Sequence, residues 1–255
     1  MLLLVISLLF SRFAHSQVEY MYYYDGKLDK NGVLTVDAKG ETNSTNIPGK
    51  TIKIDDFSYI SSYYSVEDQY FNKDMFIVSD IENLNTSQPL NTSEISCNNV
   101  ALSHEMGIYG LLGFTYKSIY LSNVYSPSIT YMLKNGPSKI TYKNVADGLQ
   151  GFQDREIDQS CDSAEAINYL TFSLYNKGFA STECFPNDVI PESVDQCTNG
   201  RQVSKMLKNY KIGQFKEQDS LDIKDLLLRF GAVLVEVLKM INSATRFLLF
   251  LNEVI

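Results

Sequence analysis

Short runs in which apolar and polar residues alternate mark the first part of the chain. Residues 32–36 (Gly-Val-Leu-Thr-Val) and 51–54 (Thr-Ile-Lys-Ile) have the two-residue period of strands that are buried on one face. Residues that favour turns separate these runs, so we predict strands joined by turns. Residues 57–71 are dense in tyrosine. They are expected to pack a small β layer or to form a contact surface for carbohydrate or protein.

The apolar spacing changes to a helical period after residue 97. Apolar residues recur at every third or fourth position: Leu102, Met106, Tyr109, Leu112 and Tyr116. This spacing predicts a helix over 101–118. Each of its three glycines costs about 1 kcal/mol relative to Ala, so another backbone is expected to pack closely against the helix.

A capping pattern marks the next helix. Asp162-Ser163-Ala164-Glu165 is similar to a capping box, and apolar residues follow it at helical spacing. Gly178 is placed to end this helix, because glycine tolerates the left-handed backbone found there.

The last part of the chain mixes strands with a helix. We predict a strand over 211–215, a helix from about 220 to 229 that stops near Gly231, and a buried strand over 232–237. Residues 246–251 are apolar enough for a buried strand or helix. Helices and strands in this order indicate an α+β domain.

The first sixteen residues have the pattern of a signal peptide. Residues 1–10 are apolar but too short to span a bilayer, and small residues follow in Ala14-His15-Ser16. Cleavage is predicted before Gln17, which makes 1–16 the leader. The alternative interpretation is a core strand or helix at the N-terminus.

Cysteines and glycosylation motifs agree with export. The mature part contains an even number of cysteines, Cys97, Cys161, Cys184 and Cys197, which suggests two disulfides. No C-x-x-C spacing occurs, which argues against a zinc site. Asn43, Asn85 and Asn91 each begin an N-x-[ST] glycosylation motif. The predicted location is therefore outside the cell or in a lysosome or vacuole lumen.

Charge and motif content argue against several classes of function. The 255-residue chain has a net charge of −8 and no basic patch, which disfavours nucleic acid and anionic membranes as partners. No transmembrane segment is predicted. Of two histidines, only His104 lies outside the leader, so multi-histidine metal sites are excluded. The sequence has no G-x-G-x-x-G, P-loop or G-x-S-x-G motif, and we expect no cofactor and no metal.

Several segments together resemble the papain-like cysteine peptidases, nearest to the cathepsin B and cathepsin X branches. The family's C-G-S-C-W-A motif is matched by residues 97–102 (Cys-Asn-Asn-Val-Ala-Leu), and its segment ending in Asp-Cys is matched by 140–148. Residues 160–163 (Ser-Cys-Asp-Ser) stand where the family has G-C-x-G-G. Glu183-Cys184-Phe185-Pro186 matches the later Cys and Tyr-Pro turn, and 226–233 matches a helix that runs into N-G-P-[VI]. The resemblance covers roughly 97–238.

The resemblance implies a fold and a disulfide pairing. It implies a papain-like domain over 97–255, made mostly of the helical left-hand half, with an incomplete right-hand β part at the C-terminus. Residues 17–96 would then be a propeptide or a small β module. The family pairing implies a Cys97–Cys161 bridge and leaves Cys184–Cys197 as the second. Gly148 replaces a further family cysteine, so that bridge is absent.

The departures from the family fall on its catalytic positions. Val100 stands in place of the nucleophilic cysteine and cannot form an acyl-enzyme. Glu94 stands at the oxyanion-hole glutamine, where a carboxylate would repel the developing charge. No histidine follows His104, which we interpret as an ordinary helix residue.

The resulting hypothesis is a non-catalytic homologue that binds a peptide or protein in a remnant cleft. Two alternatives stay open: an unrelated extracellular Tyr-rich binding or structural glycoprotein, and an aberrant fragment of an active cysteine peptidase gene.

Overall fold

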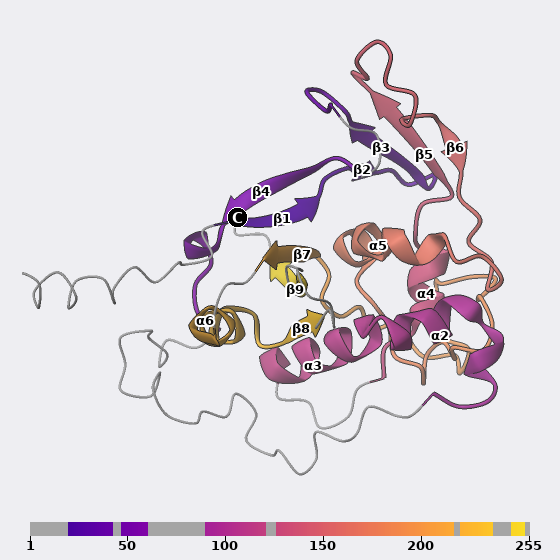
Figure 1. The fold of residues 1–255 in the computed structure, drawn as a ribbon. Coiled ribbons are helices and arrows are strands. Elements are labelled where there is room, and N and C mark those ends of the chain that lie inside the picture. The colour runs from indigo at the N-terminus through magenta and orange to yellow at the C-terminus, as the bar shows by residue number, and fades with distance from the viewer. Residues whose placement is uncertain are drawn as a thin grey trace, which may run out of the picture.

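Two β-sheets and a group of helices make up the fold (Figure 1). The computed structural model describes residues 20–42, 47–60, 90–120, 126–216, 220–236 and 246–252. In the described part, helices and strands are mixed along the chain, which confirms the α+β class. No described helix is long and apolar enough to cross a membrane.

The larger sheet has the strand order β4-β1-β7-β9-β8. Its strands are β1 (Tyr20–Tyr24), β4 (Gly49–Lys53), β7 (Tyr210–Lys216), β8 (Val233–Glu236) and β9 (Arg246–Asn252). All its neighbouring strands are antiparallel. Residues 246–252, for which the sequence left strand or helix open, form the strand between β7 and β8.

The smaller sheet has the strand order β2-β3-β5-β6. Its strands are β2 (Lys27–Leu28), β3 (Val33–Asp37), β5 (Lys139–Lys143) and β6 (Arg155–Glu156). Strands β3 and β5 are parallel, with Val33 opposite Lys139 and Asp37 opposite Lys143. Strands from the first hundred residues therefore pair with later strands in both sheets.

The helix predicted over 101–118 is two helices, which corrects the sequence interpretation. Helix α2 (Asn98–Glu105) ends at Met106, and α3 (Ile108–Tyr120) starts two residues later. Gly107 between them has φ +72°, a left-handed backbone that breaks the helix. A Cβ at Gly107 would lie 2.5 Å from Cδ1 of Leu234, so a side chain, and not a backbone, makes the close approach.

The predicted capping box at residues 162–165 does not form. The first helical turn is the 3₁₀ helix η4 (Ala166–Tyr169), whose N-cap Glu165 has no side-chain cap bond, and α5 (Leu170–Lys177) follows. The Ser163 hydroxyl instead accepts a bond from the Glu165 amide in a local turn. The predicted end is confirmed, because Gly178 has φ +73° at the C-cap.

The predictions for the remaining elements are confirmed within one or two residues. The strands expected at 32–36, 51–54 and 211–215 correspond to β3, β4 and β7. Helix α6 (Ser220–Phe230) is followed by Gly231 at φ +79° and then by β8. Among the described elements, three short helices were not predicted: η1 (Ile54–Asp56), η3 (Glu94–Ser96) and α4 (Ile129–Lys134). Strands β1, β2, β5 and β6 were not predicted either.

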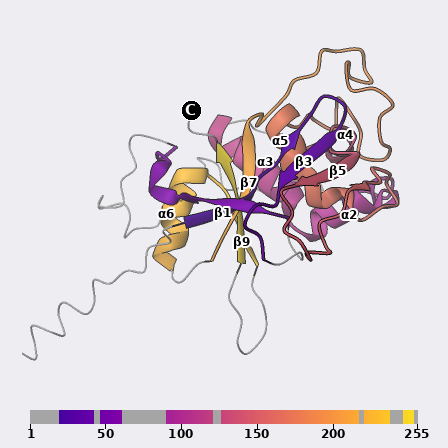
Figure 2. The same cartoon turned by 90° about the horizontal axis from the view of Figure 1, so that it is seen from above.

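Two apolar clusters hold these elements together. The larger one joins α2, α3, α4 and α5 to the inner face of the smaller sheet. The smaller one lies between α6 and the larger sheet, where Leu226 and Phe230 pack with Met21 of β1 and Phe215 of β7. Figure 2 shows α6 beside β1 in the view from above.

Some sequence predictions fall outside the described residues. These are the leader 1–16, the glycosylation motifs at Asn43 and Asn85, and residues 61–71 of the tyrosine-dense segment.

Candidate functional site at the start of helix α2

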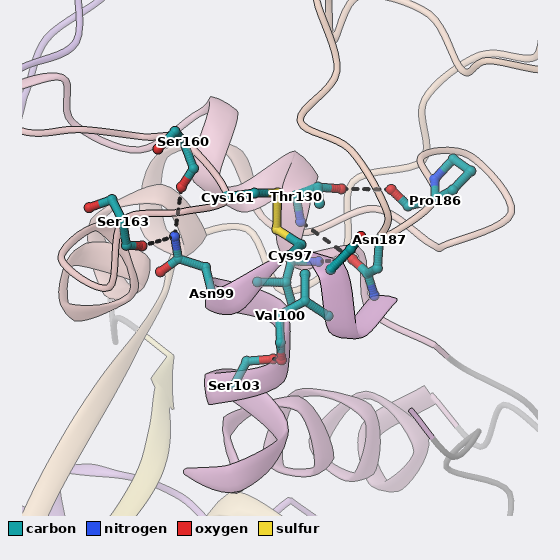
Figure 3. The surroundings of a disulfide bond; sticks show 12 residues. Cys97, Asn99, Val100, Ser103, Thr130, Ser160, Cys161, Ser163, Pro186 and Asn187 are labelled. Carbon is teal, nitrogen blue, oxygen red and sulfur yellow. Dashed lines mark hydrogen bonds between the residues drawn. A yellow bond between two sulfur atoms is a disulfide. The ribbon is translucent and has the colours of Figure 1, made fainter. Parts of the chain in front are cut away.

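A disulfide fixes the start of α2 to a distant segment. Cys97, one residue before the helix, is bonded to Cys161 with a Cα–Cα distance of 4.5 Å (Figure 3). Cys184 and Cys197 form the second bridge, so all four cysteines are paired. Both pairings are those that the family resemblance implied. Two bridges are compatible with a secreted or lumenal protein.

Asn99 adds a polar connection beside the disulfide. Its side chain is fully buried, and its amide nitrogen donates to the carbonyl oxygens of Ser160 (2.9 Å) and Ser163. These are the residues on either side of Cys161-Asp162. The segment around Cys161 is therefore bonded to α2 through Ser160 and Ser163 as well as through the disulfide.

Val100, which the family resemblance places at the nucleophile position, is sealed from solvent. Its exposed fraction is 0 %, and it belongs to the larger apolar cluster. The Ser103 hydroxyl, also fully buried, donates to the Val100 carbonyl at 2.7 Å within the helix. The position thus carries an apolar side chain that packs the core and makes no contact with solvent.

Glu94 stabilises a turn before α2. It is 8 % exposed, and its Oε2 accepts a bond from the Asn91 amide at 3.0 Å. In return, the Asn91 Oδ1 accepts from the amides of Ser93 and Glu94. A carboxylate used in this way supports the backbone and offers no hydrogen-bond donor to an oxyanion. Asn91, which begins a glycosylation motif, is exposed in this turn.

His104 lies near the other end of α2, stacked on Tyr109. The ring centroids are 3.9 Å apart, and the Nε2 atom is buried with no hydrogen-bond partner in the described structure. Burial lowers the pKa of His104, while the charge of Glu94 acts in the opposite direction. Burial also raises the pKa of Tyr109. His104 is thus a neutral packing residue near neutral pH.

Asn187 is a buried polar residue that sequence reasoning missed. It is 2 % exposed; its Oδ1 accepts from the Ile129 amide at 2.7 Å, and its Nδ2 donates to the Pro127 carbonyl at 3.1 Å. The adjacent Pro186 carbonyl accepts from the Thr130 hydroxyl at 2.9 Å. These bonds join the Cys184–Cys197 loop to the start of α4. No local sequence pattern predicts a contact between residues so far apart in the chain.

No group of three or more His, Cys, Asp or Glu side chains that could hold a metal ion occurs within the described ranges.

Comparison with protein-family models, with curated proteins and with solved structures found no match.

Proposed function

We propose that the protein is a secreted or lumenal, non-catalytic relative of the papain-like cysteine peptidases, which binds a peptide or protein in the remnant of the family's cleft. The observation that carries the proposal is the start of α2. There Cys97 is bridged to Cys161, and Val100 is buried where the family has its nucleophile.

Two further observations support the non-catalytic part of the proposal. No cysteine is free, so no thiolate is available as a nucleophile. Glu94 is held by the Asn91 amide in a turn and does not present a hydrogen-bond donor.

The binding part of the proposal is supported by an exposed apolar side chain next to Glu94. Ile95 is 55 % exposed, although it lies two residues from the buried Cys97. Single exposed apolar side chains are common on protein surfaces. Ile95 is proposed as an anchor because it lies beside the start of α2, which the Cys97–Cys161 disulfide holds in place.

The first experiment tests for catalysis. The purified secreted protein is treated with a thiol-directed probe of papain-like peptidases and assayed for peptide hydrolysis, and its disulfides are mapped by mass spectrometry. We expect no labelling, no turnover and a Cys97–Cys161 bridge. Labelling of any cysteine together with turnover would overturn the proposal.

The second experiment tests for binding. The immobilised protein selects peptides from a random library, and selection is repeated with Ile95→Asp. Val189→Asp is the matched control, because Val189 is also apolar and 62 % exposed but belongs to the Cys184–Cys197 loop. Peptides selected by the wild type should be lost with Ile95→Asp and kept with Val189→Asp. The binding proposal fails if no peptide is enriched or if both variants behave alike.

A further inference from the structure

A polar groove of about 520 Å³ lies away from the start of α2, where the two sheets meet. One wall is the end of the antiparallel β1–β4 pair, with Asp25 and Lys50. The other wall is the smaller sheet, with Lys27 on β2, Thr35 on β3 and Lys143 on β5. Figure 1 shows these strands converging above the helices.

Strand register explains why this wall is polar. Lys27 is opposite Thr35, and Asp37 is opposite Lys143. Side chains two residues apart on a strand share a face, so Thr35 and Asp37 point the same way. Leu34 and Val36, which alternate with them along β3, are fully buried in the core on the other face. The sheet therefore presents its hydrophilic face to the groove.

The charges of the groove do not cancel. Lys50 Nζ lies 2.6 Å from Asp25 Oδ2, and Lys143 Nζ lies 3.6 Å from Asp37 Oδ2. In the described structure no carboxylate lies within ion-pair distance of the remaining lysines, Lys27 and Lys39, and both are exposed. Glu41 is the third acidic group of the lining and makes no ion pair there.

Four lysines against three carboxylates give the groove a local charge of +1 in a chain of net charge −8. The hydrogen bond from Asn144 to Asp37 lowers the pKa of that carboxyl, so Asp37 stays ionised and remains available to hold Lys143. An incoming anion is thus attracted to the two lysines that have no carboxylate partner.

We propose that this groove binds a small polar ligand through a phosphate or sulfate group, with Lys27 and Lys39 as the charged contacts and Thr35 as a hydroxyl contact. Lysine side chains contact such oxyanions as point charges with several donors. Pro48 is the one apolar side chain of the lining, so the rest of the ligand is hydrophilic. A volume of this size accommodates a molecule as large as a hexose phosphate. The inference goes beyond the proposed function and does not depend on it.

Binding is measured by NMR titration of the ¹⁵N-labelled full mature protein. The probes are inorganic phosphate, inorganic sulfate, glucose 6-phosphate and, as a neutral control, glucose. We expect saturable shifts of groove amides with the anions and none with glucose. A tighter fit of glucose 6-phosphate would show that the groove holds the ligand body, and equal affinities would show that it holds the oxyanion. Either ranking supports the proposal.

Substitutions locate the contacts. Lys27→Gln and Lys39→Gln should each weaken binding of the best anion by about fivefold or more, because each loses a charge-assisted hydrogen bond. Lys30→Gln is the matched control, since Lys30 is an exposed lysine of the β2–β3 turn that does not line the groove. The affinity of Lys30→Gln for the anion should equal that of the wild type. Glu41→Gln should bind the anion more tightly, because it removes a negative charge from the lining.

Three results would overturn the proposal. The first is the absence of saturable anion binding in the wild type. The second is an equal loss of affinity in Lys27→Gln, Lys39→Gln and Lys30→Gln. The third is binding of glucose with the affinity of glucose 6-phosphate. Thermal melting of each variant checks folding, which these exposed substitutions should leave unchanged. A negative titration would leave the peptide-selection result at Ile95 untouched, so the two proposals fail separately.

Discussion

The guanidinium of Arg229 lies over the ring of Tyr59, with Cζ 4.6 Å from the ring centroid. The same group donates to Asp225 Oδ2 at 2.9 Å and to Asp55 Oδ1 at 3.2 Å. A backbone bond from the Ile60 amide to the Leu228 carbonyl runs beside it at 2.9 Å. Helix α6 is thereby attached to the segment that follows β4.

Replacing Arg229 should therefore destabilise the fold. Its side chain is only 11 % exposed, so Arg229→Ala leaves several polar partners unsatisfied and is expected to cost about 2–3 kcal/mol of unfolding free energy. Urea denaturation measures the change, with the exposed Arg201→Ala as control. Arg229→Lys should recover only part of the loss, because a lysine cannot make the forked contacts. A loss no larger than that of Arg201→Ala would contradict this account.

The two disulfides should contribute unequally to stability. They close loops of sequence separation 64 and 13. The loop-entropy model then gives about 4 kcal/mol for Cys97–Cys161 and about 3 kcal/mol for Cys184–Cys197. The double variants Cys97→Ala/Cys161→Ala and Cys184→Ala/Cys197→Ala, compared by urea denaturation, test the order. A larger loss from the shorter loop would show that native contacts, and not loop length, set the values.

A thiol placed at position 100 should stay inert. Val100→Cys introduces the residue type that the proposed relatives use as nucleophile, but the position is fully buried, and buried thiols react poorly. Val189→Cys, at a 62 % exposed position, is the control and should be alkylated rapidly by iodoacetamide. Mass spectrometry confirms the native disulfides in both variants. Rapid alkylation of Val100→Cys, or peptide hydrolysis by it, would indicate an open catalytic position.

His104 should make the fold less stable in mild acid. Burial lowers its folded-state pKa below the usual value of about 6.5, so the unfolded chain takes up a proton more readily. The contribution of neutral His104 to the free energy of unfolding is complete above the unfolded-state pKa. It is lost as the pH falls through the folded-state pKa. Melting temperatures between pH 7.5 and about pH 5 measure the loss. His104→Gln should flatten this dependence of melting temperature on pH, because the other histidine, His15, belongs to the predicted leader. An unchanged slope would show that carboxylates, and not His104, cause the dependence.

Local patterns were sufficient to predict the elements that have a clear apolar period or a glycine stop. The alternation in β3 and β4 and the glycine stops after α5 and α6 act over a few residues, and the structure agrees with them. The sequence did not predict the division between α2 and α3, because a glycine such as Gly107 is compatible with a helical backbone as well as with a left-handed one. A side chain at this position would clash with Leu234, more than a hundred residues away, and local sequence patterns do not reveal such a contact.

Tertiary arrangements were not predictable from spacing. The charge of Glu94 acts on the pKa of His104, although the two residues lie on either side of most of α2. Asn187 has three buried neighbours that no motif connects to it. The lysines of the groove come from separate segments, and in the sequence each of them is indistinguishable from an ordinary solvated surface lysine. The bridges were predicted only through the family resemblance, because two pairs from four cysteines allow three connectivities.

The position of β1 between β4 and β7 also bears on how the chain is synthesised. Its partner on one side, β4, follows within thirty residues along the chain. On the other side, Tyr22 pairs with Gln214 of β7, which is synthesised much later. At roughly 5–20 residues per second, translation takes about 10–40 s to deliver that partner. For this interval the edge of β1 that later pairs with β7 has unpaired N–H and C=O groups, which could pair with another chain.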